Sequence, residues 1–270
     1  MATYDYDIAN MALARLGQGQ ITSLGQTGRD AEVCNLFYAE NRDFCLTLTD
    51  WITLTTRVHL VRAGKIAISK ITQASPCVLT CSGHVYTSGM LLTVEDALGM
   101  TEINDGVYVV KTYTATSITL YTVYGSALDA TSWAAYTSGG YAYMGAGANW
   151  QYVYDVPTDC TKFLTVLDED FGESETYTWM REKDDIYTNV ENAGAKYIKT
   201  TATISRYSTP LIHLMAARLA WCICPRITND QKLLAQLYRE WMELAALGRM
   251  ENAERKVSNE PGETLWVNAR

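Results

Sequence analysis

One long stretch of this chain has no helical periodicity, whereas the segments on either side of it do. Residues 66–143 are dominated by Thr, Tyr, Val, Ser and Gly and carry few charges. Short β-prone runs recur there, and turn signals such as Asn104-Asp105-Gly106 separate them, which is typical of strands joined by tight turns. The expected strands are 66–71, 77–81, 90–94, 107–113 and 117–123. The stretch is therefore predicted to be a small all-β module.

A first helix is predicted over residues 5–17, near the start of the chain. Its apolar positions at helical spacing are Ile8, Ala12 and Leu16. Asp5 or Asp7 can cap the helix, because a carboxylate accepts hydrogen bonds from the free amides of the first turn. Gly17 ends the pattern, and residues 18–27 are predicted to form a loop.

A second, longer helix is predicted over about 28–49. Its apolar stripe consists of Ala31, Cys34, Tyr38, Cys45 and Leu48. Trp51 ends this segment. Residues 52–62 then alternate and are rich in Thr, Val and Leu, so they are predicted to form a strand.

Residues 150–203 keep a β-like character after the module. The segment Trp150-Gln-Tyr-Val-Tyr alternates, and Pro157 with Asp159 predicts a turn. Further expected strands are 163–167, 177–181, 186–189 and 197–204, with Asp184-Asp185 separating 177–181 from 186–189.

Helical spacing returns in the last third of the chain. A third helix is predicted over 208–224, with Pro225 as its stop, because proline lacks the amide that a helix interior needs. A fourth helix is predicted to run to about Leu247. The expected caps are Ser208 for the third helix and Asn229 or Asp230 for the fourth.

Helices at both ends of the chain must bury their apolar stripes, and they can do so against each other. We therefore predict an α+β fold with a four-helix bundle from the N- and C-terminal helix pairs, a central antiparallel β domain and an inserted small all-β domain. The core comprises 1–65 and 144–249, the inserted module 66–143, and an extended C-terminal arm 250–270. The expected bundle core residues are Ile8, Ala12, Leu16, Tyr38, Leu48, Trp51, Leu211, Leu219, Leu237 and Trp241.

The composition argues against several classes of protein. Hydrophobic residues make up 48% of the chain, which is enough for a packed core. The formal net charge of −8 argues against tight binding to nucleic acid, which needs clustered Lys and Arg. It is compatible with a surface that DNA slides past, and equally with plain solubility. No apolar run approaches the length of a membrane span, and the acidic N-terminus lacks the features of a signal peptide, so we expect the product to stay in the cytoplasm.

The seven cysteines are the most suggestive candidates for chemistry. Their odd number is typical of reduced thiols rather than a disulfide framework. Cys77, Cys81 and His84 lie close enough in sequence to hold a metal, but no second pair follows at a zinc-like distance. We therefore favour packed thiols in the β module, with metal binding as the open alternative. We expect no catalytic residue, no metal and no cofactor.

Acidic clusters give the chain its one route to an enzyme. They are Asp168-Glu169-Asp170, Glu173, Glu175 and Asp184-Asp185. Paired carboxylates can hydrolyse sugars, so a virion-associated peptidoglycan hydrolase using Glu169 and Glu173 is an alternative. Their spacing fits no calcium loop that we can name, and solvated loop charges are the favoured interpretation.

An ordered set of residues carries a family resemblance. The opening has Ile8-Ala9-Asn10-Met11-Ala12-Leu13, Leu16-Gly17, Ile21-Thr22-Ser23-Leu24, Ala31, Cys34, Tyr38, Arg42-Asp43, Leu46, Trp51, Arg57 and Leu60. The later part has Trp150-x-Tyr152-x-Tyr154-x-x-Pro157-x-Asp159, the strand 163–167, Tyr207-x-x-Pro210-Leu211, Ala216-Ala217-Arg218-Leu219-Ala220 and the ending Leu265-Trp266-Val267-Asn268-Ala269-Arg270. Together they resemble the tail tubular protein A family, the gatekeeper or head-to-tail adaptor of short-tailed bacteriophages.

This resemblance implies a structural virion protein rather than an enzyme. It implies a homo-oligomeric ring, twelvefold, between the portal protein and a tail nozzle protein similar to tail tubular protein B. Double-stranded DNA would pass through during ejection without sequence-specific binding. The expected location is the head–tail junction of the virion, with the host cytoplasm during assembly and no membrane partner. The expected portal-docking residues are Leu265, Trp266, Val267 and Arg270, where an apolar anchor follows the polar residues 249–263.

The module at 66–143 departs from the usual adaptor chain. It resembles a small β-module of phage structural proteins through Pro76-x-Val78-x-Thr80, His84, Gly89, 99–104, Tyr108-x-Val110 and 136–140. A carbohydrate- or receptor-binding tail component is a third possibility, since aromatic rings can stack on sugars. The candidate rings are Tyr113, Tyr121, Tyr124 and Trp133. They equally fit ordinary β-sheet propensity, which we favour.

Overall fold

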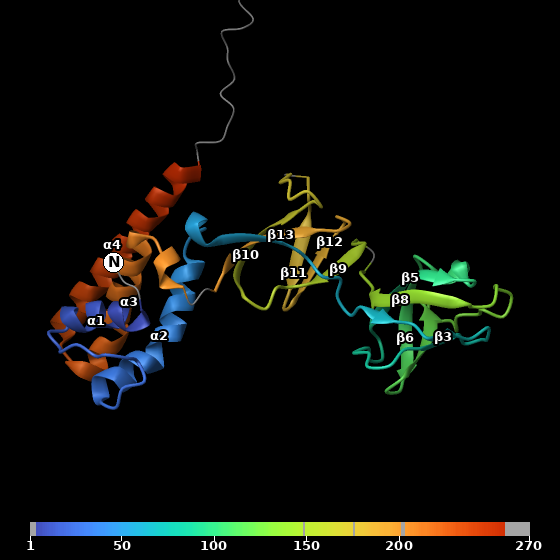
Figure 1. Ribbon diagram of the computed structural model, residues 1–270, viewed down its shortest axis with the longest axis horizontal. Helices are drawn as coiled ribbons and strands as arrows, with labels where there is room; N and C mark the ends of the chain where they lie inside the picture. Colours follow the sequence, from blue (N-terminus) through green and yellow to red (C-terminus); the bar gives the residue numbers. More distant parts are fainter. Residues whose placement is uncertain (1–3, 148, 175, 201–202, 257–270) are drawn as a thin grey trace, which may run out of the picture. The chain divides into compact units, whose positions relative to one another are not determined.

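The computed structural model describes residues 4–147, 149–174, 176–200 and 203–256, with side chains described as far as residue 250 in the last helix. Over this part of the chain the protein is a mixed α+β structure with four α-helices and several antiparallel sheets (Figure 1). The α-helices are α1 Asp5–Arg15, α2 Arg29–Thr47, α3 Thr209–Ile227 and α4 Gln231–Lys256. Short 3-10 helices cover Ile52–Leu54, Thr101–Ile103 and Ile204–Arg206.

The strands fall in the order that the sequence predicts, between the two pairs of helices. They are β1 Thr55–His59, β2 Ile66–Ala67, β3 Lys70–Ile71, β4 Val78–Thr80, β5 Leu91–Leu98, β6 Val107–Tyr113, β7 Ser117–Thr122, β8 Ser138–Met144, β9 Tyr152–Asp155, β10 Cys160–Leu167, β11 Trp179–Glu182, β12 Asp185–Thr188 and β13 Gly194–Lys199. Within the described residues these strands form three sheets, in the orders β1-β13-β10, β11-β12-β9 and β2-β8-β5-β6-β7-β4-β3.

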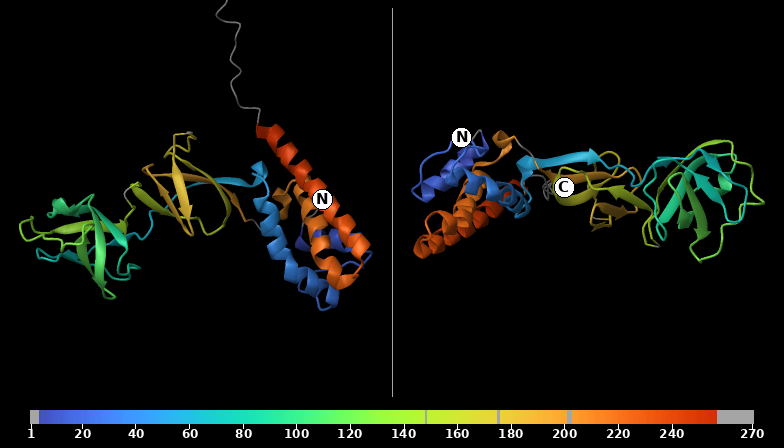
Figure 2. Two further views of the ribbon diagram at one scale, coloured as in Figure 1. Left: turned by 180° about the vertical axis from the view of Figure 1, so that it is seen from behind. Right: turned by 90° about the horizontal axis from the view of Figure 1, so that it is seen from below.

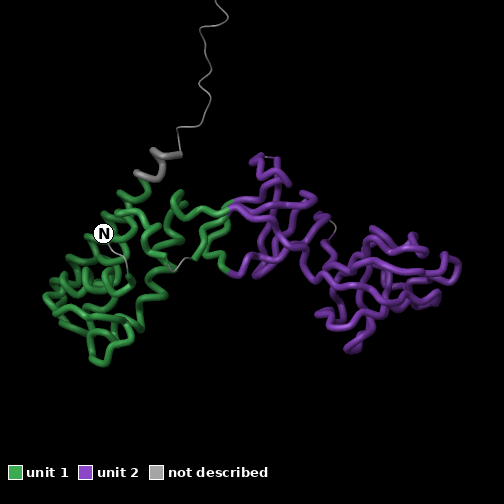
Figure 3. The backbone as a smooth tube through the Cα atoms, viewed as in Figure 1, with its two compact units in different colours: residues 1–56, 159–164, 197–270 green, residues 57–158, 165–196 purple. Residues whose placement is uncertain are grey.

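The chain divides into two compact units, which Figure 3 colours separately. Unit 1 contains residues 1–56, 159–164 and 197–270, and unit 2 contains residues 57–158 and 165–196. Residues 57–65, 144–158 and 165–196, which we expected in one core with the helices, are grouped in unit 2 by this division. The separate module expected at 66–143 is a finer division inside unit 2 and stays a prediction.

The helices of unit 1 share one hydrophobic core. Figure 2 shows α4 running along α3, and α3 also contacts α1 and α2. Apolar side chains of all four helices meet there, as amphipathic helices require. The centre is α3, whose buried residues cover most of its circumference: Leu211, Ile212, Leu214, Met215, Ala216, Ala217, Leu219, Ala220, Ile223 and Cys224.

The helix starts are close to expectation, but both C-terminal helix ends were wrong. Pro225 lies inside α3 instead of stopping it, because a proline near the end removes only one backbone hydrogen bond, the one to the Trp221 carbonyl. The helix ends at Ile227, and two residues later Asn229 has a positive φ of 53° and donates its amide hydrogen bond to the Cys224 carbonyl oxygen.

The fourth helix starts as predicted but runs further. Asp230 caps α4, since its Oδ1 accepts hydrogen bonds from the amides of Lys232 (2.8 Å) and Leu233 (3.2 Å). The helix continues past the expected end at Leu247 to Lys256. The added residues are mostly strong helix formers such as Met, Glu, Ala, Arg and Lys, so residues 250–256 are helical and not part of an extended arm.

The seven-stranded sheet of unit 2 closes around its own core. Residues 66–71 pair with β8 through Ile66 and Ala67 and with β4 through Lys70 and Ile71. Since β8 and β4 lie near opposite ends of the strand order, one short segment joins both edges and the sheet is rolled up. Inward side chains such as Leu79, Leu92, Val110 and Leu120 are fully buried inside it.

Several strand predictions needed correction. Residues 52–54 form a 3-10 helix, closed by the hydrogen bond from the Leu54 amide to the Trp51 carbonyl oxygen (2.9 Å), so β1 starts only at Thr55. Strand β8 was missed, because its start contains Gly139 and Gly140, both with positive φ, and glycine gives no β signal. The run expected at 197–204 is shifted, since β13 covers Gly194–Lys199 and Ile204 begins a 3-10 helix.

Candidate functional site

The first acidic cluster is held in a loop of unit 2 by its own hydrogen bonds. Asp168 Oδ1 accepts from the amides of Gly172 (2.6 Å) and Asp170 (3.0 Å), and Oδ2 accepts from the Tyr177 hydroxyl (3.0 Å). These bonds, led by the Gly172 amide, lower the pKa of Asp168. A general acid needs the opposite shift, so Asp168 stabilises the loop and is poorly suited to donate a proton.

Glu173 is a partner of two cations. Its Oε1 lies 2.6 Å from Lys196 Nζ and 3.0 Å from an Arg57 guanidinium nitrogen. These contacts, with Lys196 first, lower the pKa of Glu173. Glu169 is exposed in the same loop, and Glu175 lies outside the described residues. Glu173 therefore lacks the raised pKa that an acid catalyst requires.

The pKa values of a different carboxylate pair in unit 2 shift in the other direction. Asp155 of β9 and Asp185 of β12 are direct cross-strand partners. Burial raises the pKa of both, and for Asp185 the charges of Asp155, Asp184 and Glu182 add to the rise. Sequence analysis named Asp184-Asp185 as a strand separator and as an acidic cluster, but the facing Asp155 was not anticipated.

Cys77 and Cys81 are fully buried on one face of the β4 region, together with Leu79. Burial raises the pKa of both thiols to about 11, which disfavours the thiolate that a metal needs. His84 Nε2 lies 2.7 Å from the Thr114 carbonyl oxygen. Within the residues that the structure describes, no group of three His, Cys, Asp or Glu side chains is placed to hold a metal.

The aromatic candidates of the β module are dispersed among separate contacts. Tyr113 is half-exposed near His84, with ring centroids 6.4 Å apart. Tyr121 lies beneath Lys111, whose Nζ is 5.5 Å from the ring centroid. Tyr124 is 93% exposed. Trp133 packs against the core of the rolled sheet. Among the described residues, these four rings do not contact one another.

The ten expected bundle residues all lie at the common core of unit 1. Nine are buried, and Leu48 is half-buried at the edge of that core. The four expected docking residues, Leu265, Trp266, Val267 and Arg270, lie outside the described residues.

Unit 1 carries an aromatic face that the sequence analysis missed. We define it as Phe44 of α2, Trp221 of α3, and Tyr238, Trp241 and Met242 of α4. The Trp221, Tyr238 and Trp241 ring centroids lie 5.6 to 6.0 Å apart, and the Phe44 ring is 6.3 Å from Trp241. Such distances suit edge-to-face and tilted aromatic pairs. Four aromatic rings therefore form one connected surface over three helices.

This aromatic face combines a buried base with exposed edges. Trp241 is buried and belongs to the core, while Trp221 is half-buried. Tyr238 and Met242 are each 46% exposed, and Phe44 is 38% exposed. The missed signal was the pair Tyr238 and Met242, since an i, i+4 pair outside the expected stripe marks a second apolar face on α4.

A guanidinium supports the α2 side of the aromatic face. Arg218 of α3 stacks on Phe44, with its central carbon 3.7 Å from the ring centroid. The same side chain donates a hydrogen bond to Asn41 Oδ1 at 3.0 Å. Phe44 is thereby held in place although it is exposed.

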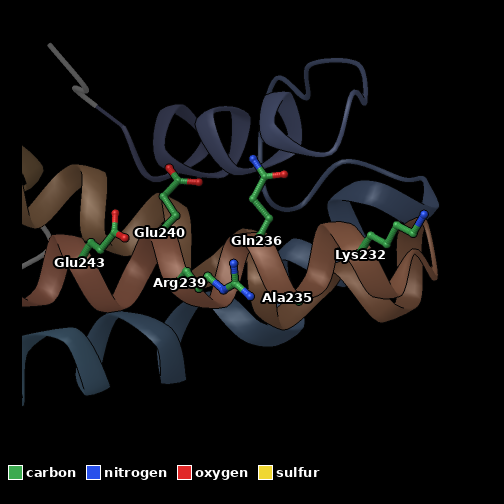
Figure 4. Close-up of a pocket in the computed structure, with 6 residues that line it drawn as sticks. All are labelled: Lys232, Ala235, Gln236, Arg239, Glu240 and Glu243. Carbon is green, nitrogen blue, oxygen red and sulfur yellow. The ribbon is translucent and has the colours of Figure 1, made fainter.

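A shallow groove lies along α4, and Figure 4 shows the side chains that line it. All its lining residues come from this helix: Lys232, Ala235, Gln236, Arg239, Glu240 and Glu243. Glu240 forms an ion pair with Arg15 of α1 at 2.8 Å. Arg239 precedes Met242 by three residues and follows Tyr238 directly, so the groove borders the aromatic face.

Comparisons with known proteins identify no relative. The chain matches no model of a protein family and no curated protein sequence. In the described part of the chain, no helix combines the length and the apolar character that a membrane span needs.

Proposed function

We propose that this chain is a non-enzymatic structural subunit, the head-to-tail adaptor of a short-tailed bacteriophage. In this proposal copies of the chain form a ring, twelvefold, between the portal and the tail nozzle, and DNA passes through it during ejection. The ordered motifs that resemble the tail tubular protein A family are the starting point of the proposal.

The observation that supports it best is the shared core of helices from the two chain ends. Residues Ile8 and Leu16 of α1 pack in the same core as Leu211 and Leu219 of α3. The strands lie between these helices in the chain. We propose that the helices form a four-helix bundle that braces the ring, and that the β part faces the nozzle.

The use of the acidic side chains favours a structural role over a hydrolase. Asp168 and Glu173, which belong to the acidic cluster at 168–175, are engaged in a loop and in ion pairs. Both have a lowered pKa, whereas sugar hydrolysis needs a protonated acid near neutral pH. These carboxylates therefore stabilise unit 2 in this proposal.

The charge distribution suits passage of DNA rather than its capture. Residues 165–196 contain nine acidic and three basic residues. Such a segment repels the phosphate backbone, and binding to DNA would need the opposite sign. We propose that DNA is in transit only and makes no sequence-specific contact.

The C-terminal segment is proposed to dock on the portal through Leu265, Trp266 and Val267, with Arg270 beside them. An aromatic anchor at the end of a polar segment is typical of docking sites, where few side chains carry most of the binding energy. The location that follows is the head–tail junction of the virion, with assembly in the host cytoplasm.

Co-sedimentation with the portal protein of the same phage tests this proposal. The full chain should sediment with the portal, and Trp266→Ala should raise the dissociation constant at least tenfold, because a buried aromatic anchor is worth about 2 kcal/mol or more. Asn268→Ala is the matched control and should bind like the unchanged chain. Failure of the full chain to sediment with the portal would exclude the adaptor.

A further inference from the structure

We propose that the C-terminal segment 257–270 docks on the aromatic face of its own chain, with Leu265, Trp266 and Val267 covering Tyr238, Met242 and Phe44. The inference concerns the free chain and does not depend on the portal. It assigns a use to a surface that the adaptor proposal leaves unexplained.

The aromatic face has the properties of a docking surface. Tyr238 and Met242 are each 46% exposed although they adjoin Trp221 and Trp241, which belong to or pack against the core. Exposed aromatic side chains that are backed by fixed rings lose little conformational entropy on binding. Covering them removes apolar area from water, and this favours an apolar occupant.

The length of chain beyond α4 lets its end reach this face. Tyr238 precedes Lys256 by eighteen residues, which places it roughly 27 Å back along the helix. Trp266 follows Lys256 by ten residues, and an extended chain of that length spans roughly 33 Å. The segment can therefore run back along α4 and set Trp266 against Tyr238, with little slack.

The charges beside the face match the charges of the segment. Arg239 and Arg249 of α4 are exposed, and neither forms an ion pair with another side chain that the structure describes. The segment carries Glu260 and Glu263 ahead of its apolar residues. When the segment runs back along α4, these two carboxylates lie beside the two arginines before Trp266 reaches Tyr238. The same alignment therefore satisfies the charged and the apolar contacts.

Storage on the aromatic face also excludes the use of the same residues elsewhere. While Leu265, Trp266 and Val267 cover Tyr238 and Met242, they are not free to bind a partner. Any partner that binds this segment must first displace it from the aromatic face. The observed affinity for the partner is therefore the intrinsic affinity multiplied by the fraction of chains whose segment is undocked. The aromatic face thus sequesters segment 257–270 in the free chain.

The test follows Trp266 by ¹⁹F NMR in the full chain labelled with 5-fluorotryptophan. Trp266→Phe identifies its resonance among the seven tryptophans. We expect the wild-type signal to differ in chemical shift from that of a synthetic, labelled peptide 257–270. Met242→Glu, and separately Tyr238→Glu, should move the signal to the peptide position, because a charge on the face opposes docking of an indole.

Leu247→Glu is the matched control. Leu247 is also exposed on α4, but five residues from Met242 it points about 140° away around the helix. This variant should leave the Trp266 signal unchanged. A wild-type signal at the peptide position, or equal effects of Met242→Glu and Leu247→Glu, overturns the proposal. A signal that returns to the peptide position on dilution also overturns it, because the segment would then occupy a second copy.

Discussion

The side-chain amide of Asn41 in α2 donates a hydrogen bond to the Met215 carbonyl oxygen in α3, with nitrogen and oxygen 3.0 Å apart. Asn41 is buried, and its Oδ1 accepts the hydrogen bond from Arg218 described above. The Asn41 side chain thus hydrogen-bonds two groups of α3, a helix from the other end of the chain. Such a buried polar contact fixes how two apolar helices pack against each other.

Replacing Asn41 by Ala should lower the free energy of unfolding of unit 1 by about 2 kcal/mol, because the partly buried Arg218 loses its acceptor. Urea unfolding followed by circular dichroism at 222 nm, which reports mainly on the helices, measures this. Asn35→Ala, at an exposed position of the same helix, should change stability by less than about 0.5 kcal/mol. Equal effects of the two variants would show that the Asn41 contacts contribute nothing.

Arg62 holds two β-sheets of unit 2 together, and its removal should destabilise that unit. Its guanidinium lies 2.9 Å from Glu95 and stacks between Tyr143 (4.4 Å) and Tyr152 (4.8 Å). Arg62→Met should cost about 2 kcal/mol, because it leaves Glu95 without its partner and removes the cation–π contacts.

The measurement for Arg62 is the urea midpoint of unit 2, followed by tyrosine and tryptophan fluorescence. Lys70→Met serves as the control, since Lys70 is an exposed cation of the same unit. An Arg62→Met midpoint that matches the Lys70→Met midpoint would contradict the assigned role.

Alanine substitutions at two glycines distinguish the cost of backbone strain from the cost of a steric clash. Gly99 and Gly125 have φ of 85° and 86°, but a Cβ on Gly99 would lie 2.8 Å from the Thr137 amide nitrogen, whereas one on Gly125 would meet nothing within 4 Å. Gly125→Ala should cost about 1 kcal/mol from strain alone. Gly99→Ala should cost clearly more, by about 2 kcal/mol. Thermal unfolding of both variants measures the two losses of stability. Equal losses would contradict the prediction, because they would mean that the sheet accommodates the added Cβ at Gly99 without cost.

The facing pair Asp155 and Asp185 predicts a pH-dependent gain in stability. The pKa of Asp185 is raised, so its charged form costs stability above that pKa, and the cost fades as the pH falls towards the ordinary value near about 3.9. Asp185→Asn should therefore raise the melting temperature at pH 7, by an amount that corresponds to less than about 1 kcal/mol. The gain should shrink as the pH is lowered towards 4. A gain that is constant with pH, or a loss at pH 7, would contradict the assigned repulsion.

The features that could be predicted from the sequence are those that depend on the periodicity of apolar residues and on turn signals. The spacing of Ile8, Ala12 and Leu16 places them in one core, and the cap at Asp230 follows from its position before an apolar stripe. Strand β6 is found at its expected bounds, since alternation and the turn at Asn104-Asp105-Gly106 both mark it.

The misses occur where tertiary contacts override local pattern. Pro225 is tolerated inside α3 because Asn229 supplies the αL cap four residues later. Strand β8 contains Gly139 and Gly140 near its start, and a Cβ on Gly140 would lie only 3.0 Å from the Ala97 Cα of β5, so glycine is favoured there. The aromatic face was not predicted, because Phe44, Trp221 and Tyr238 meet only after α2, α3 and α4 have packed.

The central claim is that copies of this chain form a ring on a portal, and counting the copies in that complex tests it most directly. The full chain is mixed with the portal protein of the same phage, and the complex is imaged by cryo-electron microscopy without imposed symmetry. We expect a closed ring of about twelve copies beneath the portal, since symmetric oligomers require matched interfaces that close. A portal without added density, although residues 257–270 are intact, would contradict it.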